Sequence, residues 1–494
     1  MTAKWLQAGV GLLLVVVASG CESSGAKDEP VPDSGTVEDG GAEPSACEKQ
    51  QGVCAGATRA WVDGAYEPEC TARSYGADYE AAETRCDGLD NDCDGVTDPP
   101  SWSRVTRLTQ PLNGATVASL RTDSGVLVAV TESLDEVRIL RLDSKLVLQG
   151  SSTVPSPWAR TGEPPGASYN LRLVDTKDGP ALYYATGSRT SGPPLRAYLV
   201  PLDSSGAPQS QPEGGAVDSL VLDRPLDSGS ARMAMSQDGE RLMVVWRSSP
   251  GPDLPAQLLG TVTDVHGQVL TAPKALFTLP ADSNSHAESI LWLRNGDVVV
   301  VTTEQLPPAM GDTVRLRRFD SNLELLGDER TFTTNNGSMP GLVDLGATRG
   351  GPLESPVLVL RNRNPPDWRH EIQVVRNLFG GGVPEFLAEA AIAPEIAYFN
   401  AFVDEGALRL AWLAVSKDTS LPSDGSMLGT QGRLWTQDEG HAPADRSPGP
   451  ERLPLHAYAQ WVLMEKLGPR RMGALYMTST QEGSSLDAVR YCTP

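Results

Sequence analysis

One short stretch near the N-terminus, RCDGLDNDCDGVTD at residues 85–98, concentrates side chains that bind hard cations. Counted from Asp90, carboxylates occupy alternate positions, a glycine follows where a loop must bend, and a backbone carbonyl and another carboxylate come seventh and ninth. This spacing is typical of the first part of an EF-hand-like calcium loop, because a turning backbone points alternate carboxylates at one ion. The candidate ligands are Asp87, Asp90, Asp92, Asp94, Val96 through its carbonyl, and Asp98. Ser101 replaces the usual final glutamate, which predicts weak calcium binding with a Kd of about 10⁻⁴–10⁻³ M.

A turn without an ion, closed by a bond between Cys86 and Cys93, is the alternative interpretation of this stretch. The density of carboxylates favours a cation, since these groups repel one another without one. CDGLDNDCDGVTD, with GVCAGATRAWVDGAYEPEC upstream, resembles the MopE-type metal-binding motif over about residues 47–98. The resemblance implies an exported module associated with a metal. It does not imply that this chain binds copper, because the first histidine is His266 and Trp61 alone cannot form a copper site.

Cysteines provide the frame that must hold this loop. Five fall within residues 47–93, a region too small for a large core, and such domains depend on disulfides. The candidates for disulfides are Cys47, Cys54, Cys70, Cys86, Cys93 and Cys492. Their fifteen possible pairings stay open, including a bond from Cys492 to the module. Asp63-Gly64, between Ala60-Trp61-Val62 and Ala65-Tyr66, predicts a hairpin.

The N-terminus indicates export. A lysine, an apolar run and Ala18-Ser19-Gly20-Cys21 compose a signal peptide over residues 1–20 that resembles those of bacterial lipoproteins, with Cys21 as the lipidated residue. Residues 21–46 are rich in Ser, Gly, Pro, Asp and Glu and predict a disordered tether. The cysteine-rich, metal-binding module is expected at 47–100. Glu22 in place of aspartate favours the outer membrane of a cell envelope, with the lipid as the attachment.

Residues 101–494 repeat with a period of about 55, set by turn glycines such as Gly125, Gly179 and Gly239. A second marker with the same period is an aspartate turn after the third strand of a unit, at Asp143, Asp203, Asp264 and Asp320. Seven units of short strands predict an all-β fold, a seven-bladed β-propeller preceded by the small disulfide-rich module. MAMSQDGERLMVVWRS at 233–248 resembles the repeats of TolB-like propellers. Residues 103–109 are expected to supply the outer strand of the last blade and so close the ring.

Composition limits the function. A net charge of −22 argues against nucleic acid as a partner. The sequence contains no His-Glu-x-x-His, Gly-x-Ser-x-Gly or phosphate-loop motif, although a propeller can bring catalytic residues together from different blades. We therefore expect a lipid-anchored, non-catalytic envelope protein that uses calcium and binds a protein or glycan on its propeller loops. The alternative is a surface polysaccharide hydrolase or lyase on the same scaffold.

Overall fold

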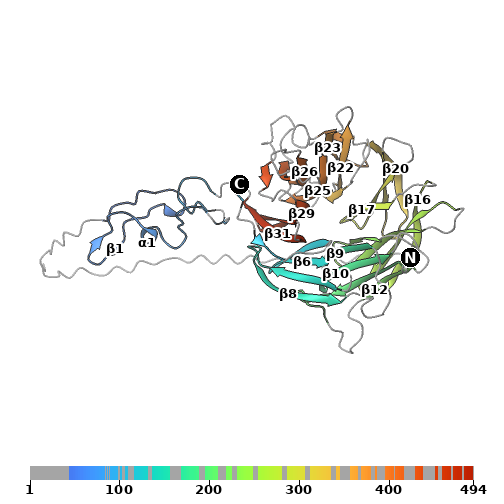
Figure 1. The fold of residues 1–494 in the computed structure, drawn as a ribbon, viewed down its shortest axis with the longest axis horizontal. Helices are drawn as coiled ribbons and strands as arrows, with labels where there is room; N and C mark the ends of the chain where they lie inside the picture. Colours follow the sequence, from blue (N-terminus) through green and yellow to red (C-terminus); the bar gives the residue numbers. More distant parts are fainter. Residues whose placement is uncertain are drawn as a thin grey trace, which may run out of the picture.

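A computed structural model describes residues 44–97, apart from Thr84, Cys86 and Gly88, and most of residues 101–492. The undescribed residues within the second range are 103–105, 110–115, 132–135, 156–167, 188–194, 210–218, 225–230, 249–253, 281–285, 306–311, 335–340, 345–355, 365–368, 380–383, 387–394, 405–406, 417–428, 438–450, 454–458, 469–470 and 481–482. The predicted lipidation site Cys21, the signal peptide and most of the tether lie outside the described residues. The described part is almost entirely β-structure (Figure 1), and it includes no helix long and apolar enough to cross a membrane.

The N-terminal module is small and irregular. It contains a 3-10 turn η1 (Gly52–Cys54), the hairpin strands β1 (Trp61–Val62) and β2 (Ala65–Tyr66), and helix α1 (Ala72–Tyr75). The hairpin forms as predicted, with Trp61 opposite Tyr66 and both turn residues at positive φ. The buried core consists of a few side chains, Cys47, Cys54, Tyr75 and Cys93. A core this small stabilises a fold only weakly, so the module depends on its disulfides.

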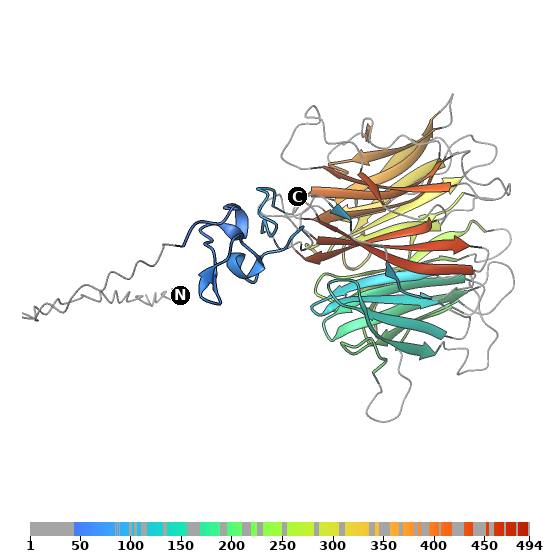
Figure 2. The same ribbon diagram turned by 60° about the vertical axis from the view of Figure 1, so that its left-hand side comes forward.

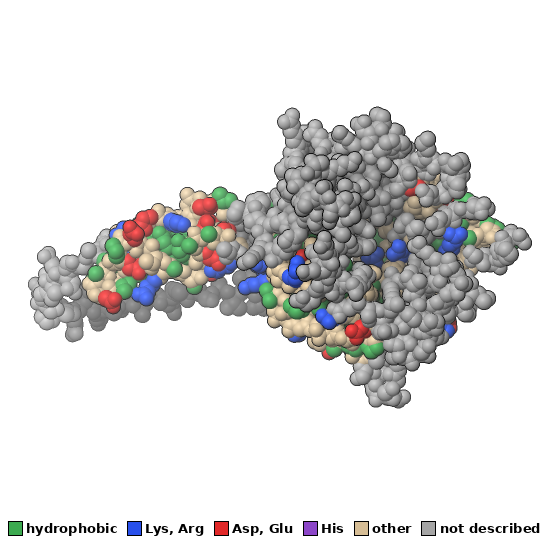
Figure 3. All heavy atoms as spheres, viewed as in Figure 1, with side chains coloured by type: hydrophobic (Ala, Val, Ile, Leu, Met, Phe, Trp, Pro, Cys, Tyr) green, Lys and Arg blue, Asp and Glu red, His purple; other side chains and the backbone are tan. Residues whose placement is uncertain are grey.

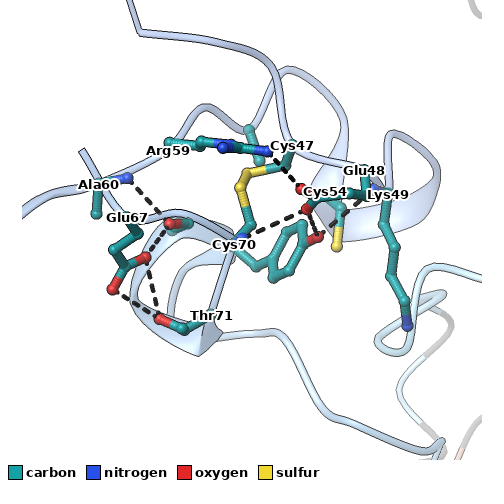
Figure 4. The surroundings of a disulfide bond; sticks show 12 residues. Cys47, Glu48, Lys49, Cys54, Arg59, Ala60, Glu67, Cys70 and Thr71 are labelled. Atoms are coloured by element: carbon teal, nitrogen blue, oxygen red, sulfur yellow. Dashed lines mark hydrogen bonds and ion pairs between the residues drawn. A yellow bond between two sulfur atoms is a disulfide. The ribbon is translucent and has the colours of Figure 1, made fainter.

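Two disulfides cross the module, Cys47–Cys70 and Cys54–Cys93. The alternative pairing of Cys86 with Cys93 is therefore wrong, because the Cys93 sulfur is already bonded to Cys54. Around the first disulfide, Glu48 accepts hydrogen bonds from Arg59 and from the Cys70 backbone (Figure 4). These bonds lower the pKa of Glu48, after the larger effect of its own backbone N–H. Cys86 lies outside the described residues, and only the backbone of Cys492 is described.

Among the described residues after 100, the strands form seven antiparallel sheets, which we name blades A to G in chain order. Blade A has β5 (Val117–Thr122), β6 (Gly125–Thr131), β7 (Glu136–Leu142) and β8 (Leu148–Pro155). Blade B has β9 (Ser168–Thr176), β10 (Gly179–Gly187), β11 (Leu195–Pro201) and β12 (Ser219–Arg224). Blade C has β13 (Arg232–Met235), β14 (Arg241–Ser248), β15 (Gln257–Asp264) and β16 (Val269–Thr278). Blade D has β17 (His286–Trp292), β18 (Val298–Gln305), β19 (Asp312–Phe319) and β20 (Leu325–Thr334).

The remaining blades follow the same order. Blade E has β21 (Gly341–Asp344), β22 (Pro356–Asn364), β23 (Arg369–Val375) and β24 (Pro384–Phe386). Blade F has β25 (Glu395–Asp404), β26 (Ala407–Ser416), β27 (Gly429–Gln437) and β28 (Glu451–Leu453). Blade G has β29 (Ala459–Gly468), β30 (Arg471–Thr480) and β31 (Gly483–Cys492), joined by β3 (Ser101–Trp102) and β4 (Thr106–Arg107).

The blades form a closed ring. The first strand of each blade contacts the first strand of the next, from β5 through β9, β13, β17, β21 and β25 to β29, and β29 returns to β5. The first strands are therefore the innermost, as in a propeller, and Figure 2 shows the blades stacked side by side with the module outside them. The predicted all-β propeller is confirmed by this arrangement of antiparallel sheets.

The ring closes through residues from its two ends. β31 pairs with both β3 and β4, so that Asp487 is opposite Arg107 and Cys492 is opposite Ser101. The Leu108 N–H donates to the Leu486 carbonyl at 2.8 Å, and the Thr109 hydroxyl accepts from the Leu486 N–H at 3.0 Å. The start of the domain thus supplies the outer strand of the last blade, as the sequence predicted for 103–109, although 103–105 lie outside the described residues.

Apolar cores lie between neighbouring blades. The second strand of blade A, β6, shows how one strand contributes side chains to two of these cores. Every residue of β6 is buried. Val126, Val128 and Val130 pack against blade G, whereas Leu127 and Ala129 pack against blade B. A strand covered on both faces needs a continuous apolar run instead of an alternating one, which is the pattern that the sequence shows here.

The aspartate turns recur in four blades with one geometry. The side chain of each aspartate accepts the backbone N–H groups two and four residues on, at 2.8–3.0 Å, in the turns that start at Asp143, Asp203, Asp264 and Asp320. The fourth residue of each turn has positive φ. It is Leu146 or Leu323 in two turns and a glycine in the others, and both leucines are buried.

Candidate metal centre

The acidic loop of the module is wound around the carboxylate of Asp90, which is 5% exposed. One of its oxygens accepts the N–H of Asp94 at 3.1 Å, and the other accepts the N–H of Gly95 at 2.9 Å. Cys93 and Gly95 both have positive φ, which lets the chain turn back on itself. A Cβ on Gly95 would meet only the end of the flexible Gln51 side chain, so it is the φ of +93° that favours glycine at this position.

The loop is fixed to the start of the module. Cys93 is bonded to Cys54, and the Val53 N–H donates to the Asp90 carbonyl at 3.1 Å. Gly52 approaches so closely that an added Cβ would lie 2.2 Å from that carbonyl oxygen. The position of Asp90 is therefore set by a covalent bond and by backbone packing, and a ligand held in this way loses little entropy on binding an ion.

Three carboxylates converge in this loop. Glu83, Asp90 and Asp92 each place one oxygen within 4.8 Å of the others. Backbone bonds set the two outer groups, since the Glu83 N–H donates to Asp92 at 3.2 Å and the Asn91 N–H donates to Glu83 at 2.7 Å. Three negative charges at this separation repel by roughly 1–4 kcal/mol per pair, depending on how far water screens them. A bound cation would remove that repulsion.

Asn91, which lies between Asp90 and Asp92 in the chain, has a buried side-chain oxygen without a partner among the described residues. Asn91 is fully buried, and its amide nitrogen donates to the Asp78 carbonyl at 2.8 Å. Buried polar atoms normally have partners. Carboxylate and amide oxygens together are the donor set that calcium prefers, and the loop contains no described histidine or free thiol for a softer metal.

The predicted ligands do not all converge on one point, as they would in an EF-hand loop. Asp90 and Asp92 lie in the converging group, but Asp87 is 4.0 Å from Arg85 and accepts the Leu89 N–H. Asp94 accepts the Val96 N–H at 2.8 Å, and the Val96 side chain is exposed. Asp98 lies outside the described residues.

Glu83 is the ligand candidate that sequence reasoning missed. It stands seven residues before Asp90, outside the alternating pattern, and no spacing rule points to it. Its approach depends on the fold of the segment between α1 and the loop, where the Glu80 N–H donates to the Asn91 carbonyl at 2.9 Å.

Basic residues surround the loop without occupying its centre. Lys49 donates to the Asp92 carbonyl and lies over the Tyr79 ring, whereas Arg85 is bound to Glu80 at 2.8 Å and Asp78 at 3.4 Å. The visible face of the module carries both signs of charge interspersed (Figure 3). Lys49 and Arg85 therefore bind a carbonyl and carboxylates at the edge of the loop.

No family model and no curated protein matches the sequence. Solved structures with a similar course of the chain include the β-propeller domain of the Trilobed protease from Pyrococcus furiosus, with a TM-score of 0.42 and 12% identity over 75% of this chain and 94% of that one. Another is BBS1N in complex with ARL6DN, with a TM-score of 0.41 and 10% identity over 80% and 97% of the two chains. A third is an arabinanase from Penicillium chrysogenum, with a TM-score of 0.37 and 12% identity over 65% and 92%. The propeller fold is shown by the strand pairing of the chain itself.

Proposed function

We propose that this chain is a non-catalytic binding protein of the cell envelope, anchored by a lipid on Cys21. In this proposal a calcium-binding module joins the tether to a propeller, and the propeller loops bind a protein or glycan. The observation that carries the proposal is the convergence of Glu83, Asp90 and Asp92 on a loop held by the Cys54–Cys93 bond. The two disulfides support export, because such bonds persist in oxidising compartments.

Calcium would be held by Glu83, Asp90 and Asp92, with the Asn91 amide as a neutral donor. The ion would neutralise the repulsion among the carboxylates and stiffen the joint between tether and ring. It would act as a structural ion, since the loop lies in the module and not on the inner strands of the propeller.

Binding without catalysis is supported by the partners of three enclosed carboxylates among the described residues of the propeller. Glu304 is paired with Arg315, and Asp487 accepts from Thr478 and lies against Arg107. Glu465, on the inner strand β29, accepts from Ser119 and has Arg121 as its charged neighbour. Hydrolysis of a glycosidic bond requires two carboxylates about 5–10 Å apart on either side of the sugar. These acids are committed instead to basic groups and hydroxyls, which favours the binding function over the polysaccharide hydrolase or lyase.

A binding assay with an activity arm tests the proposal. The full chain is immobilised and exposed to fractionated envelope glycans and proteins, with millimolar calcium or with chelator. We expect calcium-dependent retention of a component that is recovered chemically intact. Retention followed by cleavage of a polysaccharide would overturn the non-catalytic function. Release of the Cys21→Ser protein from the membrane fraction tests the lipid anchor separately.

A further inference from the structure

The inner rim of the propeller brings two arginines together across blades B and C. Arg172 lies on β9, directly opposite Tyr183 of β10. The Tyr183 hydroxyl donates to the carbonyl of Ala231 at 3.4 Å, and Asn170, two residues before Arg172, donates to the same carbonyl at 2.6 Å. This side of β9 therefore faces the start of β13, where Arg232 follows Ala231.

The two arginines differ in how far solvent reaches them, Arg172 being exposed and Arg232 half-buried. Solvent reaches the Arg172 side chain, yet burial lowers its pKa, and the charge of Arg232 lowers it further. Arg232 is half-buried, and its Nε is buried without a hydrogen-bond partner among the described residues.

Several other arginines of the propeller have acidic partners. In blade D, Glu329 accepts from Arg315 at 2.8 Å and from Arg317 at 2.6 Å. On the inner rim, Arg121 of β5 lies beside Glu465. Arg172 and Arg232 have no ion-pair partner in the part of the chain that the structure describes. Their like charges repel each other, and an arginine cannot relieve this by losing its proton.

We propose that Arg172 and Arg232 form a binding site for an oxyanion, the carboxylate or phosphate group of a ligand at the inner rim of the propeller. The planar guanidinium fork matches such groups with two parallel hydrogen bonds. The Nε of Arg232 has no hydrogen-bond partner among the described residues, so this guanidinium is not already committed within the protein. This site rests on the proposed function, in which the propeller is the part that binds the ligand. It adds the chemical group of the ligand that the propeller recognises.

Titration calorimetry of the purified full chain tests this site, with inorganic phosphate and D-glucuronate as separate probes at low ionic strength. We expect at least one probe to bind, and R172M and R232M each to weaken that binding about 10- to 100-fold, because each removes a charged donor. The matched control is R196M, which removes a half-buried arginine paired with Asp223 in the same blade. It should bind the probe like the wild type.

A merely structural role is distinguished by unfolding without any probe. If Arg172 binds a ligand, R172M relieves repulsion and keeps or raises the unfolding midpoint. If Arg172 is structural, the midpoint falls. Two results would overturn the site, namely no binding of either probe at tens of millimolar, or equal binding by wild type, R172M and R232M. If either result occurs and the full chain still retains an uncharged envelope component, the proposed binding function stands. Only the oxyanion site is then refuted.

Discussion

Closure of the ring by residues 101–109 makes Leu108 a sensitive position. Leu108 is 7% exposed and packs with Val130 of blade A and Leu486 of blade G, at the seam where the two ends of the domain meet. Replacement of a buried leucine by alanine costs about 2–5 kcal/mol, the loss of burial plus the cavity. A domain is stable by only about 5–15 kcal/mol, so Leu108→Ala should remove a large fraction of the total.

Calorimetry gives the expected shift. With about 2.1 cal/mol/K of unfolding entropy per residue over roughly 390 residues, the loss corresponds to a fall in Tm of about 2–6 °C. The control is Leu254→Ala, at a side chain that is 59% exposed, which should change Tm by less than about 1 °C. Equal Tm values for the two variants would refute the closure, because they would show that the N-terminal segment is not part of the cooperative unit.

Three further predictions concern local features. Leu146→Gly should be more stable than Leu146→Ala by about 1 kcal/mol, since φ is +58° there and glycine adopts it without strain; urea unfolding measures this, and the opposite order would contradict the turn geometry. Burial raises the pKa of Glu465 above its ordinary 4.5, so its contribution to stability is full below that value and is lost as pH rises through the folded pKa. Unfolding midpoints should therefore show Glu465→Gln gaining on the wild type as pH rises above about 4.5, and a constant difference would argue against burial as the cause. Because four of the other cysteines pair among themselves, non-reducing peptide mass spectrometry should recover Cys86 linked to Cys492, and free thiols at both would contradict this pairing.

Repeated local patterns made the propeller predictable from the sequence. The turns at Asp143, Asp203, Asp264 and Asp320 depend on hydrogen bonds within five residues, and so a fixed spacing in the sequence reports them directly. The closing strand followed from counting strands, because the last unit lacked one. The alternating spacing within one short segment was also enough to select Asp90 and Asp92 as candidate ligands.

Features that depend on the meeting of distant segments could not be predicted. Glu83 joins Asp90 and Asp92 only because the segment after α1 folds back on the loop. The bond of Cys93 to Cys54, and not to the neighbouring Cys86, is one of many pairings that the sequence allows equally. Arg172 and Arg232 become neighbours only when blades B and C pack around the ring, since sixty residues separate them in the chain.

Calcium binding by the module is the claim on which the proposed function most depends, and calorimetric unfolding of the full chain tests it most directly. With a Kd of about 10⁻³ M, 10 mM calcium should stabilise the module by about 1.4 kcal/mol relative to chelator. Glu83→Gln should lose most of this gain, whereas Asp63→Asn, which removes a charge from the hairpin turn of the same module, should keep it. Identical unfolding in calcium and in chelator, or an undiminished response in Glu83→Gln, would contradict the assignment of the site.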